Sequence, residues 1–340
     1  MEKMSPYKWV MILFSGTIIG LLILATTWAN SMKTERFLEL HIQSDNIVYY
    51  VKYNNVKVFS EVQSSPITQV IPVNQWTYNG KNLIFVSANF ESGNDTEQLE
   101  KAGNSKLKIS LVLREKRDGE NHNYTITTFD LTPSSIYPDK IASSSVADIS
   151  LGSNNNYQTS DNGDIAVGEW LQVKEDTWID FSQEVDIDIS LPKWAYIDSD
   201  DLGNDQTMSD DEYYGMIDDL YKEYQKIWLL MKDKNKDELL QVISQRAGEY
   251  EAAFYLEPGS KLSEMERSLV SAFEHEDLSL SDMLEKDYLR LIIEANGKVA
   301  NLKPNSVSEP IIYYSHVRGS FTRFYDFYFM KKDGKWIIIR

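Results

Sequence analysis

The sequence of 340 residues contains no cysteine and only four histidines. Without cysteine, the chain has no disulfides, no thiolate metal site and no cysteine nucleophile. It also lacks the G-x-S-x-G, H-E-x-x-H, Walker A and G-x-G-x-x-G motifs of common hydrolases and nucleotide-binding proteins. We therefore expect no metal and no cofactor, and the sequence favours a protein that is not an enzyme. The histidines are dispersed along the chain, at His41, His122, His275 and His316.

Basic residues are also scarce. Lys and Arg number 34 against 52 Asp and Glu, which gives a formal net charge of −18. A charge of that sign repels the phosphates of nucleic acids, so we expect no nucleic-acid partner. The negative charge is compatible with a basic protein partner, and it is equally compatible with charge that serves only to keep the protein soluble.

One uncharged apolar run stands near the N-terminus, at Trp9–Trp28. A helix of that length spans a bilayer, and Lys3 and Lys8 precede it. We interpret residues 9–28 as a transmembrane anchor in contact with the lipid bilayer, with residues 1–8 in the cytoplasm. Residues 37–340 would then lie outside the cytoplasm, in the periplasm or on the cell surface. A cleaved signal peptide is the alternative, and it would make the protein secreted.

Gly16 and Gly20 form a G-x-x-x-G motif within this run. Small residues at that spacing allow two membrane helices to approach closely, so both glycines are candidates for helix packing. The alternative is that they are ordinary residues of a membrane helix, where glycine is common.

Residues 37–196 have the pattern of antiparallel strands. Their apolar runs are short, rich in Val, Ile, Tyr and Phe, and separated by Asn, Gly, Asp and Pro. Glu184–Leu191 alternates between apolar and polar residues, as a half-buried strand does. Asn54 and Asn55 suit a tight hairpin turn. Seven or more such strands predict a β-sandwich of the jelly-roll type.

Three segments of this region resemble the jelly-roll domains of galactose-binding-like topology that occur beside the catalytic barrels of glycoside hydrolases. The segments are Val51–Val58, Ile71–Trp76 and Asn79–Val86. The resemblance implies a jelly roll, and a carbohydrate ligand is known for many such domains. Trp76 and Trp170 are therefore candidates to stack on sugar rings, with a place in the core as the alternative. No barrel follows, so the hydrolase activity is not implied.

An acidic segment at residues 197–211 separates this region from the next. Asp198, Asp200 and Gly203 fit positions 1, 3 and 6 of a calcium-binding EF-hand loop, but Leu202 and Ser209 fail at positions 5 and 12. We therefore expect a solvated linker and no metal site.

Residues 212–340 have a helical pattern followed by strands. Ser209 and Glu212 form a capping box before a helix of about two dozen residues. A second helix is expected near Glu238–Leu256, and Ser263 and Glu266 would cap a third. Hairpin turns are expected at 296–297 and 333–334, where Asn-Gly and Asp-Gly occur. This order predicts an α+β domain with helices on one face of a sheet.

The ending Asp333–Ile339, "DGKW" plus an apolar run, resembles that of NTF2-like domains. The resemblance implies helices packed on a curved antiparallel sheet, which leaves a cavity where a ligand could bind. His316, Arg318, Arg323 and Tyr325 lie on the predicted strands and are candidates to bind a ligand or partner.

Arg246 and Glu249 lie three residues apart on the second helix. We expect a surface ion pair between them. The alternative is a buried arginine that holds the domain together.

The predicted class is thus a multi-domain α+β chain with one transmembrane helix, an antiparallel β-sandwich and an NTF2-like domain. The leading functional hypothesis is a membrane-anchored envelope protein with a non-enzymatic, protein-binding role, for which an immunity or inhibitor protein is one form. A carbohydrate-binding envelope protein that uses the sandwich is the second hypothesis. An enzyme with its site in the C-terminal cavity is the third.

Overall fold

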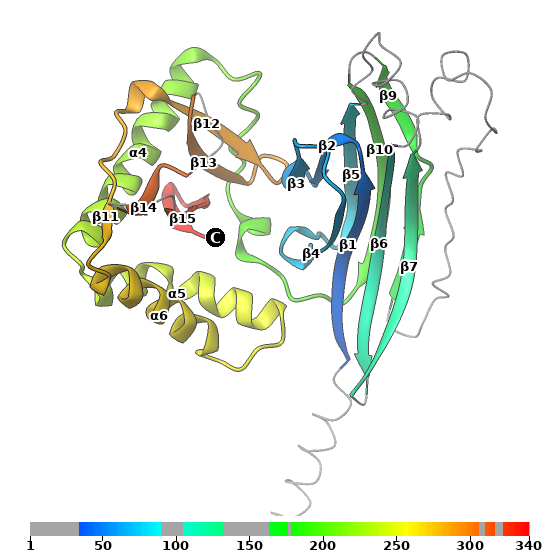
Figure 1. The fold of residues 1–340 in the computed structure, drawn as a ribbon, viewed down its shortest axis with the longest axis horizontal. Coiled ribbons are helices and arrows are strands. Elements are labelled where there is room, and N and C mark those ends of the chain that lie inside the picture. The colour runs from blue at the N-terminus through cyan, green and yellow to red at the C-terminus, as the bar shows by residue number, and fades with distance from the viewer. Residues whose placement is uncertain are drawn as a thin grey trace, which may run out of the picture.

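The computed structural model describes residues 34–89, 105–117, 119–131, 163–175, 178–305, 310–316 and 322–339. Strands predominate in these ranges, and Figure 1 shows them as a β-sandwich on one side and a mixed helical and sheet region on the other. The chain as described is therefore sheet-rich and β-sandwich-like.

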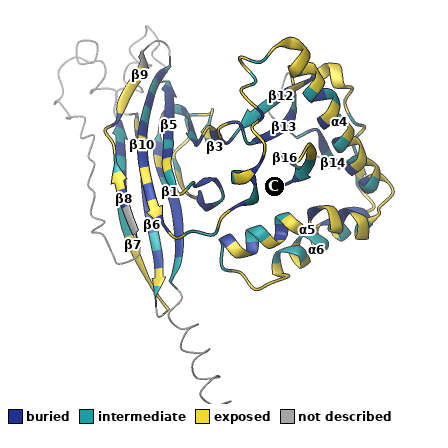
Figure 2. Ribbon diagram, turned by 180° about the vertical axis from the view of Figure 1, so that it is seen from behind, coloured by how far each residue is buried: buried dark blue, intermediate teal, exposed yellow. Residues whose placement is uncertain are grey.

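The predicted transmembrane class is corrected by this structure. None of the α-helices in the described ranges is long and apolar enough to span a membrane. The longest, α4 (Asp210–Lys232), has one face in solvent (Figure 2) and carries acidic and basic residues along its length. The predicted anchor at 9–28, with Gly16 and Gly20, lies outside the described residues. The prediction of a single-pass membrane protein with residues 37–340 outside the cytoplasm is withdrawn with it.

Two antiparallel sheets form the sandwich from the described strands. The first sheet has the order β4-β1-β6-β7, with bounds Ile67–Pro72, Glu35–Asp45, Lys106–Arg117 and Glu120–Leu131. The second has the order β3-β2-β5-β10-β8, with β9 also paired to β10, and bounds Val56–Glu61, Val48–Tyr53, Gly80–Asn89, Ile179–Ile189, Gly163–Val167 and Leu171–Glu175.

The alternation expected near the end of this region is confirmed. Along β10, Val185 and Ile187 are buried while Asp186 and Asp188 are exposed. The hairpin turn between β2 and β3 is confirmed as well, because Asn54 and Asn55 both adopt positive φ, at 51° and 63°. Only a few residue types, Asn among them, tolerate that conformation at low cost.

The second region contains helices α4, α5 (Lys236–Ala253) and α6 (Ser260–Glu274), followed by strands. Its described strands form two small sheets and not the single curved sheet of the prediction. The first has the order β11-β14-β15, with bounds Leu278–Leu280, Ile312–His316 and Thr322–Tyr325. The second has the order β12-β13-β16-β17, with bounds Leu289–Glu294, Val299–Pro304, Phe329–Lys332 and Lys335–Ile338.

A buried tyrosine explains the gap between β15 and β16. The Tyr224 hydroxyl, from α4, donates to the Phe327 carbonyl at 2.7 Å and accepts from the Leu302 amide at 3.3 Å. In a continuous sheet these two backbone groups would have paired with each other across neighbouring strands. β15 and β16 are therefore separate strands, with residues 326–328 outside any strand between them.

The helix starts differ in how they are capped. The Ser209–Glu212 capping box of α4 is confirmed. The cap predicted for α6 at Ser263 is wrong, because α6 begins at Ser260 after Gly259. Its free amides are satisfied by Glu251 of α5, whose carboxylate accepts from the Gly259 and Lys261 amides at 2.8 Å each. These hydrogen bonds, that of Gly259 first, lower the pKa of Glu251.

The acidic segment 197–211 is docked on the second region instead of being solvated throughout. The Asp200 amide donates to the Lys331 carbonyl at 2.8 Å, and the Leu202 amide donates to the Gly297 carbonyl at 2.7 Å. Gly297 has φ of +83°, and a β-carbon there would lie 2.7 Å from an Asp201 carboxylate oxygen. Only glycine fits this close approach. The described residues contain no group of three or more His, Asp or Glu that could hold a metal.

A single hydrophobic core crosses the boundary between the two regions. Trp76 and Tyr196 belong to the sandwich side of this core, and Ala295, Met330 and Ile339 reach it from the second region. A further core lies within the second region, around Tyr224 and Phe329 among others. The two predicted domains are thus packed together at a shared junction.

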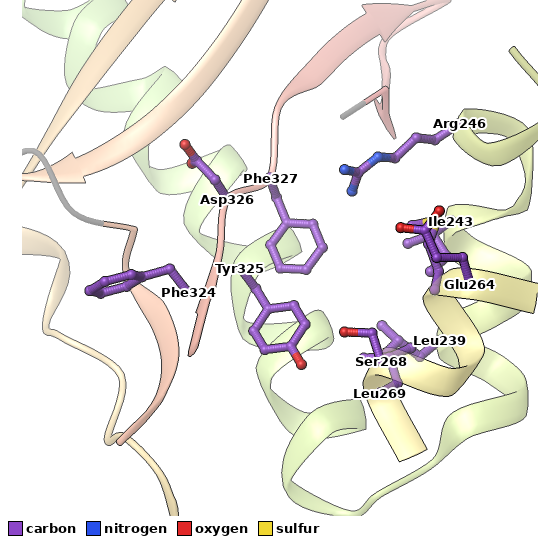
Figure 3. A pocket seen from close by; sticks show the side chains of 11 residues that line it. Leu239, Ile243, Arg246, Glu264, Ser268, Leu269, Phe324, Tyr325, Asp326 and Phe327 are labelled. Carbon is purple, nitrogen blue, oxygen red and sulfur yellow. The ribbon is translucent and has the colours of Figure 1, made fainter. Parts of the chain in front are cut away.

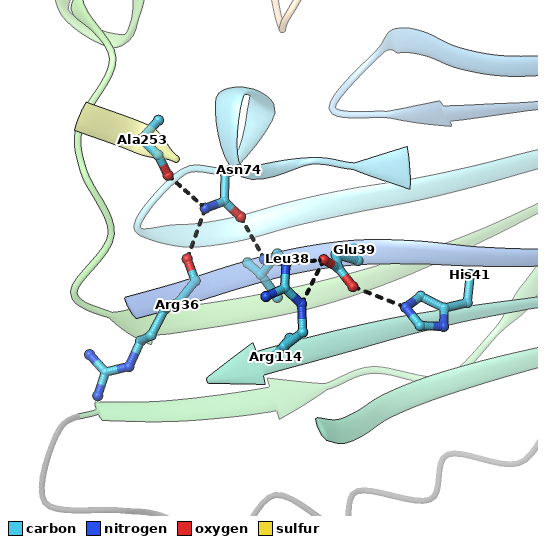
Figure 4. Close-up of polar contacts among 7 residues, drawn as sticks. All are labelled: Arg36, Leu38, Glu39, His41, Asn74, Arg114 and Ala253. Atoms are coloured by element: carbon cyan, nitrogen blue, oxygen red, sulfur yellow. Dashed lines mark hydrogen bonds and ion pairs between the residues drawn. The ribbon is translucent and has the colours of Figure 1, made fainter. Parts of the chain in front are cut away.

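Asn74 makes polar contacts across this junction (Figure 4). Its side-chain oxygen accepts from the Leu38 amide at 2.5 Å, and its side-chain nitrogen donates to the Arg36 carbonyl at 2.9 Å and the Ala253 carbonyl at 3.2 Å. Ala253 is the last residue of α5. One buried amide therefore joins β1 of the sandwich to the end of a helix in the other region.

A charged cluster on β1 and β6 lies beside this contact (Figure 4). Glu39 accepts from Arg114 at 2.7 Å and lies 3.1 Å from the His41 ring nitrogen. The Arg114 guanidinium lies 4.1 Å from the centre of the Phe37 ring, which in turn meets Tyr255 edge-on at 5.3 Å. Tyr255 follows α5, so this cluster adds a second attachment of the helix to the sandwich.

We expect Asn74→Ala to lower the free energy of unfolding by about 2–4 kcal/mol, because it leaves three buried backbone groups without this partner. Urea denaturation of the whole chain measures the change. Gln69→Ala, at an exposed position of the edge strand β4, is the control and should change stability by less than about 0.5 kcal/mol. Equal effects of the two substitutions would contradict the role given to Asn74.

Candidate functional site

The two tryptophans proposed for sugar stacking are both buried. Trp76 is 2% exposed and packs against Tyr196 and Tyr328, with ring centres 5.7 and 6.2 Å away. Trp170 is 7% exposed and lies 4.8 Å from the Phe129 ring. Neither forms an exposed platform, but Trp76 forms part of a pocket wall described below.

The candidates on the C-terminal strands are placed at different sites. Arg318 lies outside the described residues. His316 ends β14 and lies 3.8 Å from the Asp277 carboxylate. Arg323 donates to the Ser268 carbonyl of α6 at 2.9 Å. Tyr325 lines a pocket between that helix and the strands, so Arg323 and Tyr325 face the same helix.

This pocket, here called the helix pocket, has a volume of about 230 Å³ and lies between α5, α6 and residues 324–327 (Figure 3). Tyr325 and Phe327 point toward the helices, whereas Asp326 points away and pairs with Lys303 at 2.7 Å. Arg246 points toward the same space from α5. The volume is below the range of about 300–1,000 Å³ typical of ligand sites.

A second pocket, here called the junction pocket, lies between the two regions and has a volume of about 330 Å³. Its position at the boundary between two packed regions is a common place for ligand sites. Aromatic side chains make up most of its apolar wall, and two basic side chains and one amide supply polar groups. The lining residues are Ile71, Pro72, Gln75, Trp76, Trp194, Tyr196, Arg246, Tyr250, Phe254, Lys261 and Ile339.

One face of α5 lines both pockets. Leu239, Ile243, Arg246, Tyr250 and Phe254 are spaced by three or four residues, so their side chains share a face of the helix. Arg246 is the residue on this face that borders the helix pocket and the junction pocket alike. The same spacing in the sequence could have identified it as a pocket residue.

Glu249, the predicted ion-pair partner of Arg246, accepts hydrogen bonds from two other groups. Glu249 accepts from the Ala195 amide at 3.0 Å and from the Gln245 side chain at 2.9 Å. The Glu249 carboxylate therefore contacts Ala195, in the segment that follows β10, the last strand of the sandwich. Spacing along one helix could not reveal this partner, because Ala195 is distant in sequence.

Several buried polar atoms of the junction pocket lining have no hydrogen-bond partner within the described part of the chain. They include the indole nitrogen of Trp194, a residue that is 5% exposed, and the side-chain oxygen of Gln75. Buried polar groups are almost always paired, so each such exception calls for an explanation. Lys261 is occupied in part, by Glu264 at 2.9 Å and by the Tyr250 ring at 4.7 Å.

A third feature is an exposed surface on α4. Tyr214, Asp218 and Tyr221 lie on one face of this helix, at i, i+4 and i+7. The segment 284–288 runs alongside in the opposite direction, because the Tyr221 hydroxyl donates to the Leu284 carbonyl at 3.0 Å and Lys286 pairs with Asp218 at 2.6 Å. This direction brings Tyr288 toward Tyr214.

We call this surface the tyrosine surface and define it by Tyr214, Tyr221, Leu284 and Tyr288. Tyr214 and Tyr288 are 63% and 62% exposed, which is unusual for large aromatic side chains. The surrounding stretches 210–219 and 281–288 contain eight acidic residues and one basic residue. The sequence alone does not single out this surface, because its two stretches are joined only by the docking of residues 284–288 on α4.

No protein-family model, no curated protein and no solved structure matches this chain. The resemblances to galactose-binding-like and NTF2-like domains therefore rest on the quoted sequence segments. The two pockets and the tyrosine surface are the candidate sites.

The junction also predicts how stability depends on alkaline pH. The Tyr78 hydroxyl donates to the Ala295 carbonyl at 2.7 Å, and burial raises the pKa of Tyr78 to about 12. An unfolded tyrosine titrates near pH 10. The folded state therefore holds its proton more tightly, so this stabilisation is complete below pH 10 and is lost as the pH rises toward 12.

We expect the free energy of unfolding to decline between pH 10 and pH 12, as measured by urea denaturation at successive pH values. Tyr78→Phe should make this decline shallower, because it removes one of the groups that titrates. Tyr214→Phe, at an exposed position, should leave the profile unchanged. A profile that is identical in all three proteins would show that Tyr78 does not contribute.

Proposed function

We propose that this protein is a non-enzymatic binding protein whose tyrosine surface docks on a basic protein partner. The observation that carries the proposal is the pair of exposed tyrosines, Tyr214 and Tyr288, within an acidic surround. Tyrosine is enriched at the energetic centres of protein interfaces, because it combines a large apolar area with a hydroxyl.

The electrostatics of this surface favour a partner rich in Lys and Arg. Acidic side chains around an aromatic centre attract such a partner and orient it before contact. Cationic side chains can then lie over the tyrosine rings, a contact worth about 0.5–2 kcal/mol each. Lys286 is the one basic residue in the stretches 210–219 and 281–288. It pairs with Asp218 at 2.6 Å, so its charge is partly neutralised.

An inhibitor or immunity protein that covers a basic protein is the form of this function that fits such a surface. The same chemistry serves any other regulator of a basic partner. The proposal therefore concerns the binding mode and the charge of the partner.

The two alternative functions have less support in the structure. Stacking of a sugar on Trp76 or Trp170 requires an exposed indole face, and these residues are 2% and 7% exposed. A catalytic carboxylate in the helix pocket would come from Glu264 or Asp326. Both are engaged in ion pairs, at 2.9 Å with Lys261 and 2.7 Å with Lys303.

We expect the double substitution Tyr214→Ala and Tyr288→Ala to weaken binding of a labelled oligo-arginine peptide about tenfold, in fluorescence anisotropy at physiological salt. The reason is the loss of two aromatic contacts that together contribute about 1–2 kcal/mol. Asp237→Asn is the control, because Asp237 is an exposed acidic residue of α5 that does not belong to the tyrosine surface. If Asp237→Asn weakened binding as much, overall charge would explain the affinity and the proposal would fail.

A second experiment tests the surface with the natural partner in cells. A photoreactive amino acid at position 214 should cross-link one basic protein, whereas the same amino acid at position 237 should not. The identified protein should then bind the purified chain, and the tyrosine double variant should bind it more weakly. An adduct obtained equally from both positions would contradict the proposal.

A further inference from the structure

The ion pair between Lys286 and Asp218, within the tyrosine surface, marks the position of one residue of the partner. Resting on the proposed function, we infer that the basic partner places an arginine side chain on Asp218, and that this arginine displaces Lys286. Lys286 is then the chain's own occupant of the arginine site, and it competes with the partner.

The helix places Asp218 among aromatic side chains. Tyr214 lies four residues before it and Tyr221 three residues after it, so both tyrosines share its face of α4. The Tyr221 hydroxyl donates to the Leu284 carbonyl at 3.0 Å, which holds the Tyr221 side chain between the helix and the docked segment. A carboxylate beside aromatic rings matches a guanidinium, because that group forms a forked ion pair and also stacks on rings.

Lys286 occupies this carboxylate in the free protein. Its Nζ lies 2.6 Å from an Asp218 oxygen. The Asp218 carboxylate, followed by Asp287 and Tyr221, raises the pKa of Lys286. Lysine is a point charge, whereas arginine offers five donors in a planar fork. An arginine from the partner therefore makes contacts with Asp218 that Lys286 cannot make.

The displacement of Lys286 costs little. The Asp218 and Lys286 side chains are 48% and 50% exposed, and an ion pair with that exposure contributes little to stability. Asp287 is the next residue, so the displaced ammonium stays close to another carboxylate. The Asn305 amide donates to the Tyr288 carbonyl at 2.9 Å, so the backbone of the docked segment is also held by a contact that does not involve the Lys286 side chain.

The first test compares labelled hexa-arginine and hexa-lysine peptides, which carry the same charge, by fluorescence anisotropy on the full chain. The wild-type protein should bind hexa-arginine about fivefold more tightly, because only arginine forms the forked pair. Asp218→Asn should remove most of this preference. Equal affinity of the wild-type protein for the two peptides would overturn the inference.

Variants of Lys286 then test the competition. Lys286→Gln should tighten binding of hexa-arginine about two- to fivefold, because it removes the competitor for Asp218. Lys286→Arg keeps the charge and holds Asp218 more firmly, so it should weaken binding relative to the wild-type protein. Unchanged binding by Lys286→Arg would overturn the role given to Lys286.

Lys226→Gln is the matched control for the change in charge. Lys226 also pairs with an acidic residue of α4, Glu223 at 2.7 Å, and it does not belong to the tyrosine surface. This variant should leave the preference for arginine unchanged. When Asp218→Asn is also present, Lys286→Gln should have no more effect than Lys226→Gln. The same gain with and without Asp218 would show that net charge explains it, and the inference would be rejected.

The double substitution Tyr214→Ala and Tyr288→Ala separates this inference from the proposed function, since it leaves Asp218 and Lys286 in place. If the tyrosine variant lost binding while both Lys286 variants bound like the wild-type protein, the tyrosine surface would stand and the arginine exchange would be rejected. If the tyrosine variant kept full binding, the proposed function would fail and the inference with it. Loss of binding in the tyrosine variant, together with opposite effects of Lys286→Gln and Lys286→Arg, is the result expected.

Discussion

The packing of Trp76 and Tyr196 against the second region is the contact on which the rest of the structure depends. These side chains lie at the boundary of the sandwich, and they are only 2% and 0% exposed. The Tyr328 ring lies against Trp76, with ring centres 6.2 Å apart, and Met330 and Ile339 belong to the same buried core. Apolar burial of this extent is worth several kcal/mol, and the Asn74 amide adds directionality to it.

This contact determines where ligands and partners can reach the molecule. It holds the face of α5 that carries Arg246 and Tyr250 opposite the sandwich, and the space that the aromatic side chains leave unfilled there becomes the junction pocket. The tyrosine surface lies on α4, a different helix, and stays exposed. The junction pocket and the tyrosine surface therefore lie on different helices.

Local patterns in the sequence predicted the elements that depend on neighbours along the chain. The alternation of Val185 to Ile189, the turn at Asn54 and the capping box at Ser209 were all readable from a few consecutive residues. The cap of α6 by Glu251 and the interruption of a strand by Tyr224 were not, since both involve side chains from other elements. The docking of residues 197–211 and the shared core were missed for the same reason. A composition typical of a solvated linker gave no sign that its backbone pairs with two hairpins.

We infer that the sandwich and the helical region form one cooperative unit. Differential scanning calorimetry of the full chain tests this most directly. We predict a single endotherm whose calorimetric and van't Hoff enthalpies agree, because one buried core contains residues of both regions. Two separate transitions would contradict it, since they would show that each region keeps its structure after the other has unfolded.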